Sequence, residues 1–353
     1  MALAPLHDAE SKETGRSGSS VKTASFDVHS SYQAHLASSA DMPMPIAAML
    51  SLCDLISMTS VQTTTELTTL LKKASEELKD ALSNPVPATA GLDLFARLVG
   101  AMAWGDREFE EMKRDLIAVA REYAGKTVPL CRDVIAKRAM SFIKDDAVIL
   151  THSYSRVVMH ILLAAAEAGR RPSVYVTEAR PMGLGIKTYN ELQAAGIPCT
   201  VVCDSAAAYI MSKVDLVLVG AEGVCESGGL LNAVGTLQLA LIAKASDRPC
   251  YAAAESFKFL RVFPLSQHDV PTSRRHILPL TPPEAPSDAK GSASGRIGGG
   301  ASEHRMTQAM EDLNPLVDYT PPHLLAALFS DVGVLATSSG VGDALLSVYG
   351  GAD

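Results

Sequence analysis

The feature that most constrains the fold is an alternation between short apolar runs and helix-like stretches, which starts near Asp145 and continues toward the C-terminus. Each apolar run has the composition of a buried strand and ends in a polar or glycine-bearing turn. The runs are residues 147–150, 173–178, 199–204, 216–222, 250–256 and 333–336. Because parallel strands need long crossover connections, usually helices, the alternation predicts an α/β domain with a doubly wound, mostly parallel sheet over residues 144–353.

A different periodicity precedes this domain. Apolar residues recur at helical spacing between residues 43 and 143, which predicts an all-helical N-terminal domain. Within it, Thr63 and Glu66 have the spacing of a capping box, in which the hydroxyl bonds an exposed N–H and the carboxylate reaches back. Residues 1–42 are rich in Ser and Ala without a sustained period, and we expect them to form a flexible extension.

Composition narrows the class of protein. The chain has 353 residues, of which 47% are hydrophobic and 20% charged, as expected for a globular protein with a large core. A net charge of −8 argues against nucleic-acid binding through bulk charge, and no apolar segment is long enough to cross a bilayer. The six scattered cysteines predict reduced thiols in a cytoplasmic protein, and we expect neither disulfides, a metal nor a cofactor.

One segment breaks the alternation of strands and helices. Residues 271–306 are dense in Pro, Gly and Ser and offer almost nothing to bury. We therefore expect this insertion to be disordered.

Polar residues follow the predicted strands, at the edge where a doubly wound sheet has its ligand-binding crevice. They are His152, Ser153, Arg156, Glu178, Asp204, Glu222, Asn232 and Glu255. Several carboxylates together with an arginine and an asparagine suit a polyhydroxylated small molecule, with or without a phosphate. We interpret all eight residues as candidate ligand-binding residues.

Several of these residues also have a structural interpretation. Asp204 stands where a helix N-cap is needed, Glu178 can pair with Arg180, and a lone histidine such as His152 is usually a hydrogen-bonded structural residue. Neither GxxxxGK[ST] nor GxGxxG occurs after these strands, so no common nucleotide-phosphate loop is supported. The residues alone leave both interpretations open.

Five stretches of the α/β domain follow one another in a specific order: THSYSR, VYVTEARP, VVCDSAAAYIM, VDLVLVGAEGVCESGGLLNAVGT and YAAAESFKF. With these motifs and the tail VDYTPPHLLAALFSDVGVL, the chain resembles the alpha-subunit family of eukaryotic translation initiation factor 2B over about residues 46 to 350, apart from the insertion. The resemblance implies a helical domain on a Rossmann-like domain. It also implies a non-catalytic, regulatory subunit of the guanine nucleotide exchange factor that reloads initiation factor 2 with GTP.

The same superfamily contains methylthioribose-1-phosphate and ribose-1,5-bisphosphate isomerases, which use a cysteine after the first strand and an aspartate in a Gly-Ala-Asp turn. Ser153 and Glu222 stand at the matching positions. Aldose–ketose isomerisation needs a closely placed proton-transfer group, and a serine without a paired base does not replace a thiol. We therefore expect no catalytic residue, and we interpret Glu222 as an acceptor for ligand hydroxyls. Two alternatives stay open: an isomerase with rearranged groups, and a sensor of a sugar phosphate or nucleoside monophosphate.

The resemblance also implies partners. They are a second copy of the chain in a homodimer that bridges the complex, the other subunits of initiation factor 2B, and initiation factor 2, especially when its own alpha subunit is phosphorylated. We predict that Thr63, Glu66 and Tyr349 lie on the face that contacts the phosphorylated partner.

Relatives commonly carry a lysine where Ala233 stands, so a phosphate ligand would depend on another cation, such as Arg156 or Lys258.

Overall fold

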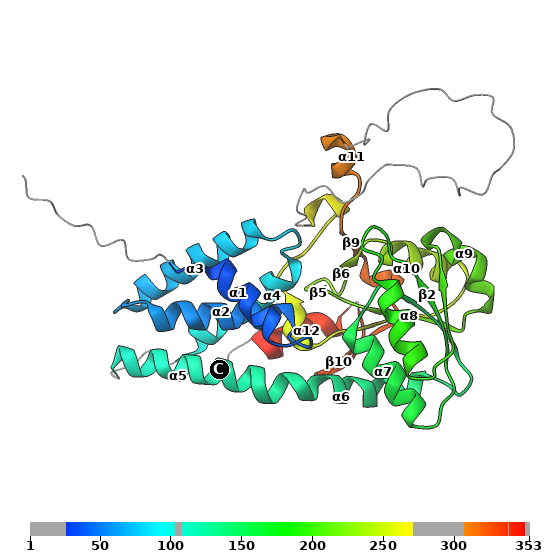
Figure 1. The fold of residues 1–353 in the computed structure, drawn as a ribbon, viewed down its shortest axis with the longest axis horizontal. Coiled ribbons are helices and arrows are strands. Elements are labelled where there is room, and N and C mark those ends of the chain that lie inside the picture. Colours follow the sequence, from blue (N-terminus) through cyan, green and yellow to red (C-terminus); the bar gives the residue numbers. More distant parts are fainter. Residues whose placement is uncertain (1–25, 103–107, 271–306, 338, 350–353) are drawn as a thin grey trace, which may run out of the picture.

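The computed structural model describes residues 26–102, 108–270, 307–337 and 339–349. A helical region is followed by an α/β domain with a mostly parallel sheet, as the sequence predicts (Figure 1). Residues 1–25 of the predicted extension and the predicted insertion over residues 271–306 lie outside the described residues.

The helical region is built around one nearly all-apolar helix. Its helices are α1 (Val28–Ser38), α2 (Met44–Met58), α3 (Thr64–Ala81), α4 (Val86–Ala101) and α5 (Phe109–Glu122). Helix α2 contacts all four others, because ten of its residues are buried. Gly91 of α4 lies so close to the Pro45 carbonyl that any Cβ at this position would overlap it.

Helix α1 corrects the prediction of a flexible extension over residues 1–42. Asp27 caps the helix by accepting a hydrogen bond from the His29 N–H at 3.0 Å, and Val28 and Tyr32 are buried in the core that α2 shares. The expectation is therefore wrong for residues 28–38. Two buried apolar residues in a polar stretch are too few to produce a recognisable helical period.

One continuous helical segment joins the two regions. Helix α5 runs through a π-helical turn, η1 (Tyr123–Thr127), into α6 (Val128–Ala139) and the short turn η2 (Met140–Phe142), with helical dihedral angles at each junction. Pro129 near the start of α6 has no N–H to continue the ladder, and the Val128 N–H bonds the Tyr123 carbonyl. Figure 1 shows this segment along the lower edge of the molecule, from the N-terminal helices to the sheet domain.

The main sheet has seven strands in the order β11-β10-β7-β4-β1-β2-β3, parallel except for β11 at one edge. The strands are β1 (Val148–His152), β2 (Ser173–Thr177), β3 (Cys199–Val202), β4 (Leu216–Gly220), β7 (Cys250–Ala253), β10 (Ala327–Ser330) and β11 (Gly333–Leu335). All of β4 is buried, as its unbroken apolar sequence predicts. The strand order reverses direction between β1 and β4, so the carboxyl ends of these two strands are the topological switch point, where doubly wound sheets bind ligands.

A second, smaller sheet has the order β8-β5-β6-β9. Its strands are β5 (Gly223–Cys225), β6 (Leu230–Ala233), β8 (Phe259–Leu260) and β9 (Val317–Thr320). It packs Leu231, Leu260 and Val317 against Val86 of α4. This sheet therefore connects the carboxyl end of β4 to the helical region.

The remaining helical elements connect or cover the strands. They are α7 (Arg156–Glu167), α8 (Gly185–Ala194), η3 (Asp204–Ala206), α9 (Ala207–Ile210), η4 (Met211–Lys213), α10 (Thr236–Ala245), η5 (Ser256–Lys258), η6 (Gln267–Asp269), α11 (Gln308–Asp312), η7 (Pro322–Leu324) and α12 (Gly340–Tyr349). Within the described ranges, no helix combines the length and the apolar character that a bilayer span requires. All six cysteines are described and are free thiols, and Cys203 alone among them is exposed.

Candidate functional site

His152, the last residue of β1, makes structural contacts through both ring nitrogens. Its Nδ1 lies 2.6 Å from the Thr177 hydroxyl, and its Nε2 donates to the Val234 carbonyl at 2.9 Å. The side chain is almost fully buried, and this burial lowers the pKa of the imidazole. A neutral ring that uses both nitrogens holds the loop before α10 against β1 and β2. The structural interpretation therefore describes its contacts.

The turn after β1 places Ser153 and Arg156 differently. Ser153 is buried in a left-handed conformation with φ of 59°, and its carbonyl accepts from the Thr188 hydroxyl at 2.6 Å. Among the described residues, no histidine or carboxylate hydrogen-bonds the Ser153 hydroxyl. Arg156 begins α7, after the N-cap Ser155, and donates to the carbonyls of Asp41 and Met42 at 2.7 and 2.9 Å.

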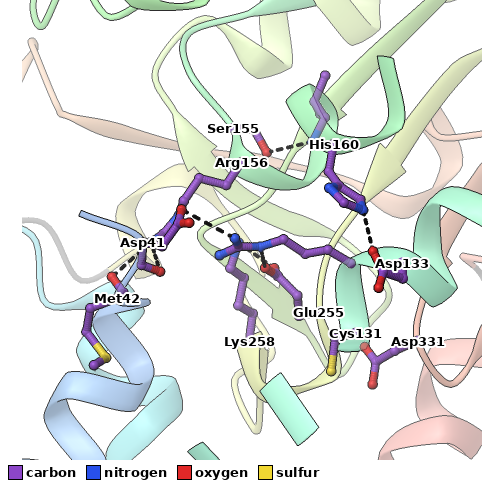
Figure 2. A network of polar contacts seen from close by, with 12 residues as sticks. Asp41, Met42, Cys131, Asp133, Ser155, Arg156, His160, Glu255, Lys258 and Asp331 are labelled. Atoms are coloured by element: carbon purple, nitrogen blue, oxygen red, sulfur yellow. Dashed lines mark hydrogen bonds and ion pairs between the residues drawn. The ribbon is translucent and has the colours of Figure 1, made fainter. Parts of the chain in front are cut away.

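Glu255 lies in the densest group of charges near the strand ends. It follows β7, is 1% exposed, and pairs with Lys258 at 2.8 Å and with Arg132 of α6 at 3.3 Å. Burial alone would raise the pKa of Glu255, but the two cations outweigh it and lower that pKa. Figure 2 shows Glu255 and Lys258 beside Arg156 and the main chain of Asp41 and Met42.

Arg132 connects this group to the helical region. Its guanidinium also lies 3.6 Å from the Asp41 carboxylate. Both arginines contact Asp41, Arg156 through its carbonyl and Arg132 through its carboxylate. Burial lowers the pKa of Arg156, and the charge of Arg132 lowers it further. We name the set Asp41, Arg132, Arg156, Glu255 and Lys258 the charged cluster. The set holds three cations and two carboxylates, and this excess of positive charge suits an anionic group.

Glu222 stands directly after β4, in the link to β5. Its Oε2 accepts from the Asn84 side-chain amide at 2.5 Å, which ties the carboxylate to the segment before α4. Burial raises the pKa of Glu222, and the Asn84 hydrogen bond and the charge of Lys258 oppose that rise in part. The carboxylate is therefore held by the helical region and lies within electrostatic reach of Lys258 in the charged cluster.

Asp318 is a second carboxyl in this part of the molecule. It lies on β9, in register with Asn232 of β6, and its Oδ2 accepts from the backbone N–H groups of Gly235 and Leu237 at 2.7 and 3.0 Å. Its Oδ1 is buried and has no hydrogen-bond partner among the described residues. Burial raises the pKa of Asp318 to about 7, against the two backbone hydrogen bonds and with the help of the Glu222 charge. Asn232 is buried beside it and donates to the Thr236 hydroxyl at 3.0 Å.

Glu178 and Asp204 belong to the turns after β2 and β3. Glu178 lies 3.5 Å from the Arg180 guanidinium, the pairing considered from the sequence. Asp204 does not cap its own helix by a side-chain hydrogen bond. Its two oxygens accept from the backbone N–H groups of Ala179 and Arg180, each at 2.8 Å. Both residues therefore have structural contacts that fix the turn after β2.

The predicted partner face has one described part. Thr63 caps α3 by accepting from the Glu66 N–H at 3.2 Å, and the Glu66 carboxylate accepts from the Gln62 N–H at 3.0 Å. The cap therefore exists, although the carboxylate bonds the residue before Thr63. Both side chains are exposed at one end of α3. Tyr349 ends α12, and its side chain lies outside the described residues.

The sequence interpretation missed four residues near the strand ends: Asp41, Asn84, Arg132 and Asp318. Asp41 and Arg132 contact the charges around Glu255, Asn84 bonds Glu222, and Asp318 lies beside Asn232. The first three come from the helical region and meet the strand ends only through tertiary packing, so no local pattern marks them. Asp318 had a usable signal, because a carboxylate in a strand of four buried residues needs a partner. In the described part of the chain, no three histidines, cysteines or carboxylates are grouped as metal ligands.

Comparison with known proteins assigns the chain to a family. A family model described as "Initiation factor 2 subunit family" matches residues 37–337. The chain belongs to this family.

Two similar members of the family are named translation initiation factor eIF2B subunit alpha. The protein from Dictyostelium discoideum is 37% identical over 312 residues, covering 88% of this chain and 92% of the relative. The protein from Caenorhabditis elegans is 31% identical over 322 residues, covering 91% and 97%. A ribose 1,5-bisphosphate isomerase from Archaeoglobus fulgidus is 34% identical over 191 residues, covering 53% and 60%.

Solved structures of the initiation factor 2 subunit family share the fold. A chain of the tetrameric eIF2B-beta2-delta2 complex from C. thermophilum matches with a TM-score of 0.68 and 18% identity, covering 91% of this chain and 94% of that one. At this identity the likeness concerns the arrangement of the helical region and the sheet.

Proposed function

We propose that the chain is the alpha subunit of a translation initiation factor 2B complex and acts there without catalysis. The observation that carries this proposal is the state of Ser153 and Glu222. The serine hydroxyl has no described base beside it, and the carboxylate is held by Asn84. Two alpha-subunit relatives aligned over most of the chain support the same assignment. The proposal places the protein in the cytoplasm.

The regulatory role requires assembly. We propose that two copies of the chain form a homodimer that bridges the other subunits of the guanine nucleotide exchange factor for initiation factor 2. Native mass spectrometry of the purified chain, alone and with co-expressed candidate subunits, tests this. A dimer that enters a larger complex is expected. A monomer that joins none of the subunits would contradict the proposal.

We further propose that Thr63, Glu66 and Tyr349 contact initiation factor 2 when its alpha subunit is phosphorylated. Exposure of Thr63 and Glu66 at the start of α3 supports this role. Substitution Glu66→Lys should weaken binding of the assembled complex to phosphorylated initiation factor 2 by about tenfold, since it reverses a charge at the interface. Surface plasmon resonance with immobilised phosphorylated factor measures the affinity.

Glu76→Lys is the matched control for this substitution. Glu76 is exposed on the same helix, farther along α3, so its reversal changes the net charge by the same amount. Equal losses of affinity in the two variants would mean that net charge acts and that Glu66 is not a contact.

The eight strand-end residues are proposed to line a pocket for a sugar phosphate or nucleoside monophosphate. Arg132 and Arg156, which both contact Asp41, support an anionic group there. They would supply the positive charge that relatives carry on a lysine at the position of Ala233. Thermal unfolding with ribose 5-phosphate and AMP should show a raised Tm that falls back in Arg156→Gln.

The alternative function, sugar-phosphate isomerisation, is favoured by the raised pKa of Glu222 and by the isomerase relative. Conversion of ribose 1,5-bisphosphate that disappears in Glu222→Gln would establish it.

A further inference from the structure

A groove of about 530 Å³ lies between α6 and α7. Both helices run toward the amino ends of the parallel strands β1 and β2, because each helical segment ends a few residues before the strand that follows it. The residues that line the groove repeat at i, i+3, i+4 and i+7, from Asp133 to Met140 on one side and from His160 to Glu167 on the other. Each helical segment therefore turns one face to the groove over two turns.

The floor of the groove is apolar. Met140 and Leu163 are half-buried and pack against the core that these helices share with the main sheet. Ala136 and Ala164 also line the groove, and their short side chains leave the space that larger residues would fill. An apolar ligand group that covers this floor removes it from water, which favours binding.

Two charges of opposite sign flank this floor. Lys137 of α6 and Glu167 of α7 are both exposed, and in the part of the chain that the structure describes neither side chain forms an ion pair or a hydrogen bond. The Asp133 carboxylate, in contrast, lies 2.7 Å from Nε2 of His160 at one end of the groove (Figure 2). Among the described residues, the groove thus offers a cation and a carboxylate on facing helices that are available to a ligand.

The size of the groove favours a small molecule over a protein. Two helical turns extend about 11 Å, whereas a specific protein–protein interface takes about 20–30 residues from each partner. The volume of about 530 Å³ lies within the range of small-molecule sites, about 300–1,000 Å³. A ligand that satisfies Lys137 and Glu167 together carries both an anionic and a cationic group, and one that covers the floor also carries an apolar group.

We propose that this groove binds a small zwitterion with an apolar side chain, of the class of the apolar α-amino acids. The ligand carboxylate pairs with Lys137, the ligand ammonium pairs with Glu167, and the ligand side chain lies on Met140 and Leu163. Hydrogen bonds between ionised groups are stronger than those between neutral groups, so the two ends of the zwitterion fix its orientation.

The groove is distinct from the charged cluster at the strand ends. Arg132 precedes Asp133 in α6, but its guanidinium pairs with Glu255 and does not line the groove. Ligand binding here therefore depends neither on the proposed pocket nor on subunit assembly.

Ligand-observed NMR titration of the full-length chain with L-leucine and L-methionine tests the proposal. Each amino acid should bind saturably at about 10 mM or below. Lys137→Met and Glu167→Gln should each weaken L-leucine binding about tenfold, because a charge-assisted hydrogen bond is lost. Lys126→Met is the matched control, since it removes an exposed cation from a pair with Glu122 outside the groove and should leave the affinity unchanged.

Two ligands that each lack one charge assign the ends of the zwitterion. L-Leucinamide keeps the ammonium and lacks the carboxylate, so its affinity should fall in Glu167→Gln and not in Lys137→Met. For 4-methylpentanoate, which keeps the carboxylate and lacks the ammonium, the two variants should exchange their effects. This crossed pattern, with an unaffected Lys126→Met, supports the site.

Several results would overturn the proposal. One is the failure of both amino acids to bind at about 10 mM. Binding that survives both Lys137→Met and Glu167→Gln places the ligand elsewhere, and an equal loss in Lys126→Met points to net charge. If neither amino acid binds and Lys137 is protected from acetylation only when partner subunits are co-expressed, the groove is a protein contact. None of these results bears on the proposed assembly, which native mass spectrometry measures separately.

Discussion

At the scale of single residues, Asp318 combines two opposed roles. Its Oδ2 supplies the anion that the N-terminus of α10 favours, and its Oδ1 is buried without a described hydrogen-bond partner. Burial destabilises the ionised form of a carboxyl in this position much more than its neutral form. The structure therefore contains a group that changes charge near neutral pH because of where β9 places it.

Substitution Asp318→Asn should remove a pH dependence of stability. The pKa of Asp318 is raised from 3.8 to about 7 in the folded chain. The folded chain favours the protonated carboxyl, so this group's contribution to the free energy of unfolding is complete below the unfolded pKa of 3.8. The contribution is lost as pH rises through the folded pKa of about 7, a change on the order of 4 kcal/mol. The amide oxygen of asparagine still accepts from Gly235 and Leu237. Urea unfolding of both proteins from pH 4 to pH 8 measures the difference in slope.

Asp215→Asn is the control for this titration. Asp215 also accepts a backbone hydrogen bond, from Val148 at 2.8 Å, at the opposite end of the sheet and exposed to solvent. If the parent and Asp318→Asn lose stability in parallel as pH rises, Asp318 is not the group responsible.

At the scale of secondary-structure elements, most strands of the main sheet and the amphipathic helices are predictable from the sequence, and the strands of the second sheet are not. Strands β1, β2, β3, β4, β7 and β11 match apolar runs, whereas β10 matches none. The second sheet was not predicted, because β5 and β6 have three and four residues and flank a glycine turn. Helix α1 was missed because only Val28 and Tyr32 are buried. Of the candidate site, the strand-end carboxylates were predicted, whereas Arg132 and Asn84 depend on how the helices dock.

Two glycines, one within a helical segment and one after a helix, should respond oppositely to alanine. Gly125 in η1 and Gly196 after α8 both have open space where a Cβ would lie, but only Gly196 has a positive φ, of +74°. Gly125→Ala should raise the free energy of unfolding by about 0.5–1 kcal/mol through lower chain entropy, and Gly196→Ala should reduce it by about 1 kcal/mol through backbone strain. Chemical denaturation measures both changes. Stabilisation by both substitutions would show that the backbone conformation after α8 is not the deciding factor.

At the scale of the whole molecule, polar contacts hold the helical region and the sheet domain together. Asn84 bonds Glu222, Arg138 donates to the Ser330 carbonyl at 2.7 Å, and Arg132 pairs with Glu255. Directional contacts of this kind define a specific docking geometry, because a small shift leaves buried charges without partners. The predicted division of the chain into a helical and an α/β domain says nothing of this docking, since each contact joins residues far apart in the sequence.

Substitution Arg132→Gln should destabilise the folded chain by about 2 kcal/mol, because Glu255 is 1% exposed and, among the described residues, keeps only Lys258 as a cationic partner. Lys126→Gln removes a cation from an exposed pair with Glu122 in the same helical segment and should change stability by less than about 0.5 kcal/mol. Thermal unfolding compares the two variants. Similar changes in both would mean that burial of Glu255 adds nothing to the pair.

The continuous segment from Phe109 to Ala139 has a mechanical consequence. Its first half is packed on the N-terminal helices, and its second half carries Arg132 to Glu255. A continuous helix that is displaced at one end also moves at its other end. The π turn at Tyr123–Thr127 is the place in this segment where the α-helical hydrogen-bond pattern changes. We therefore expect a displacement of α5 on the N-terminal helices to move Arg132 relative to Glu255 as well.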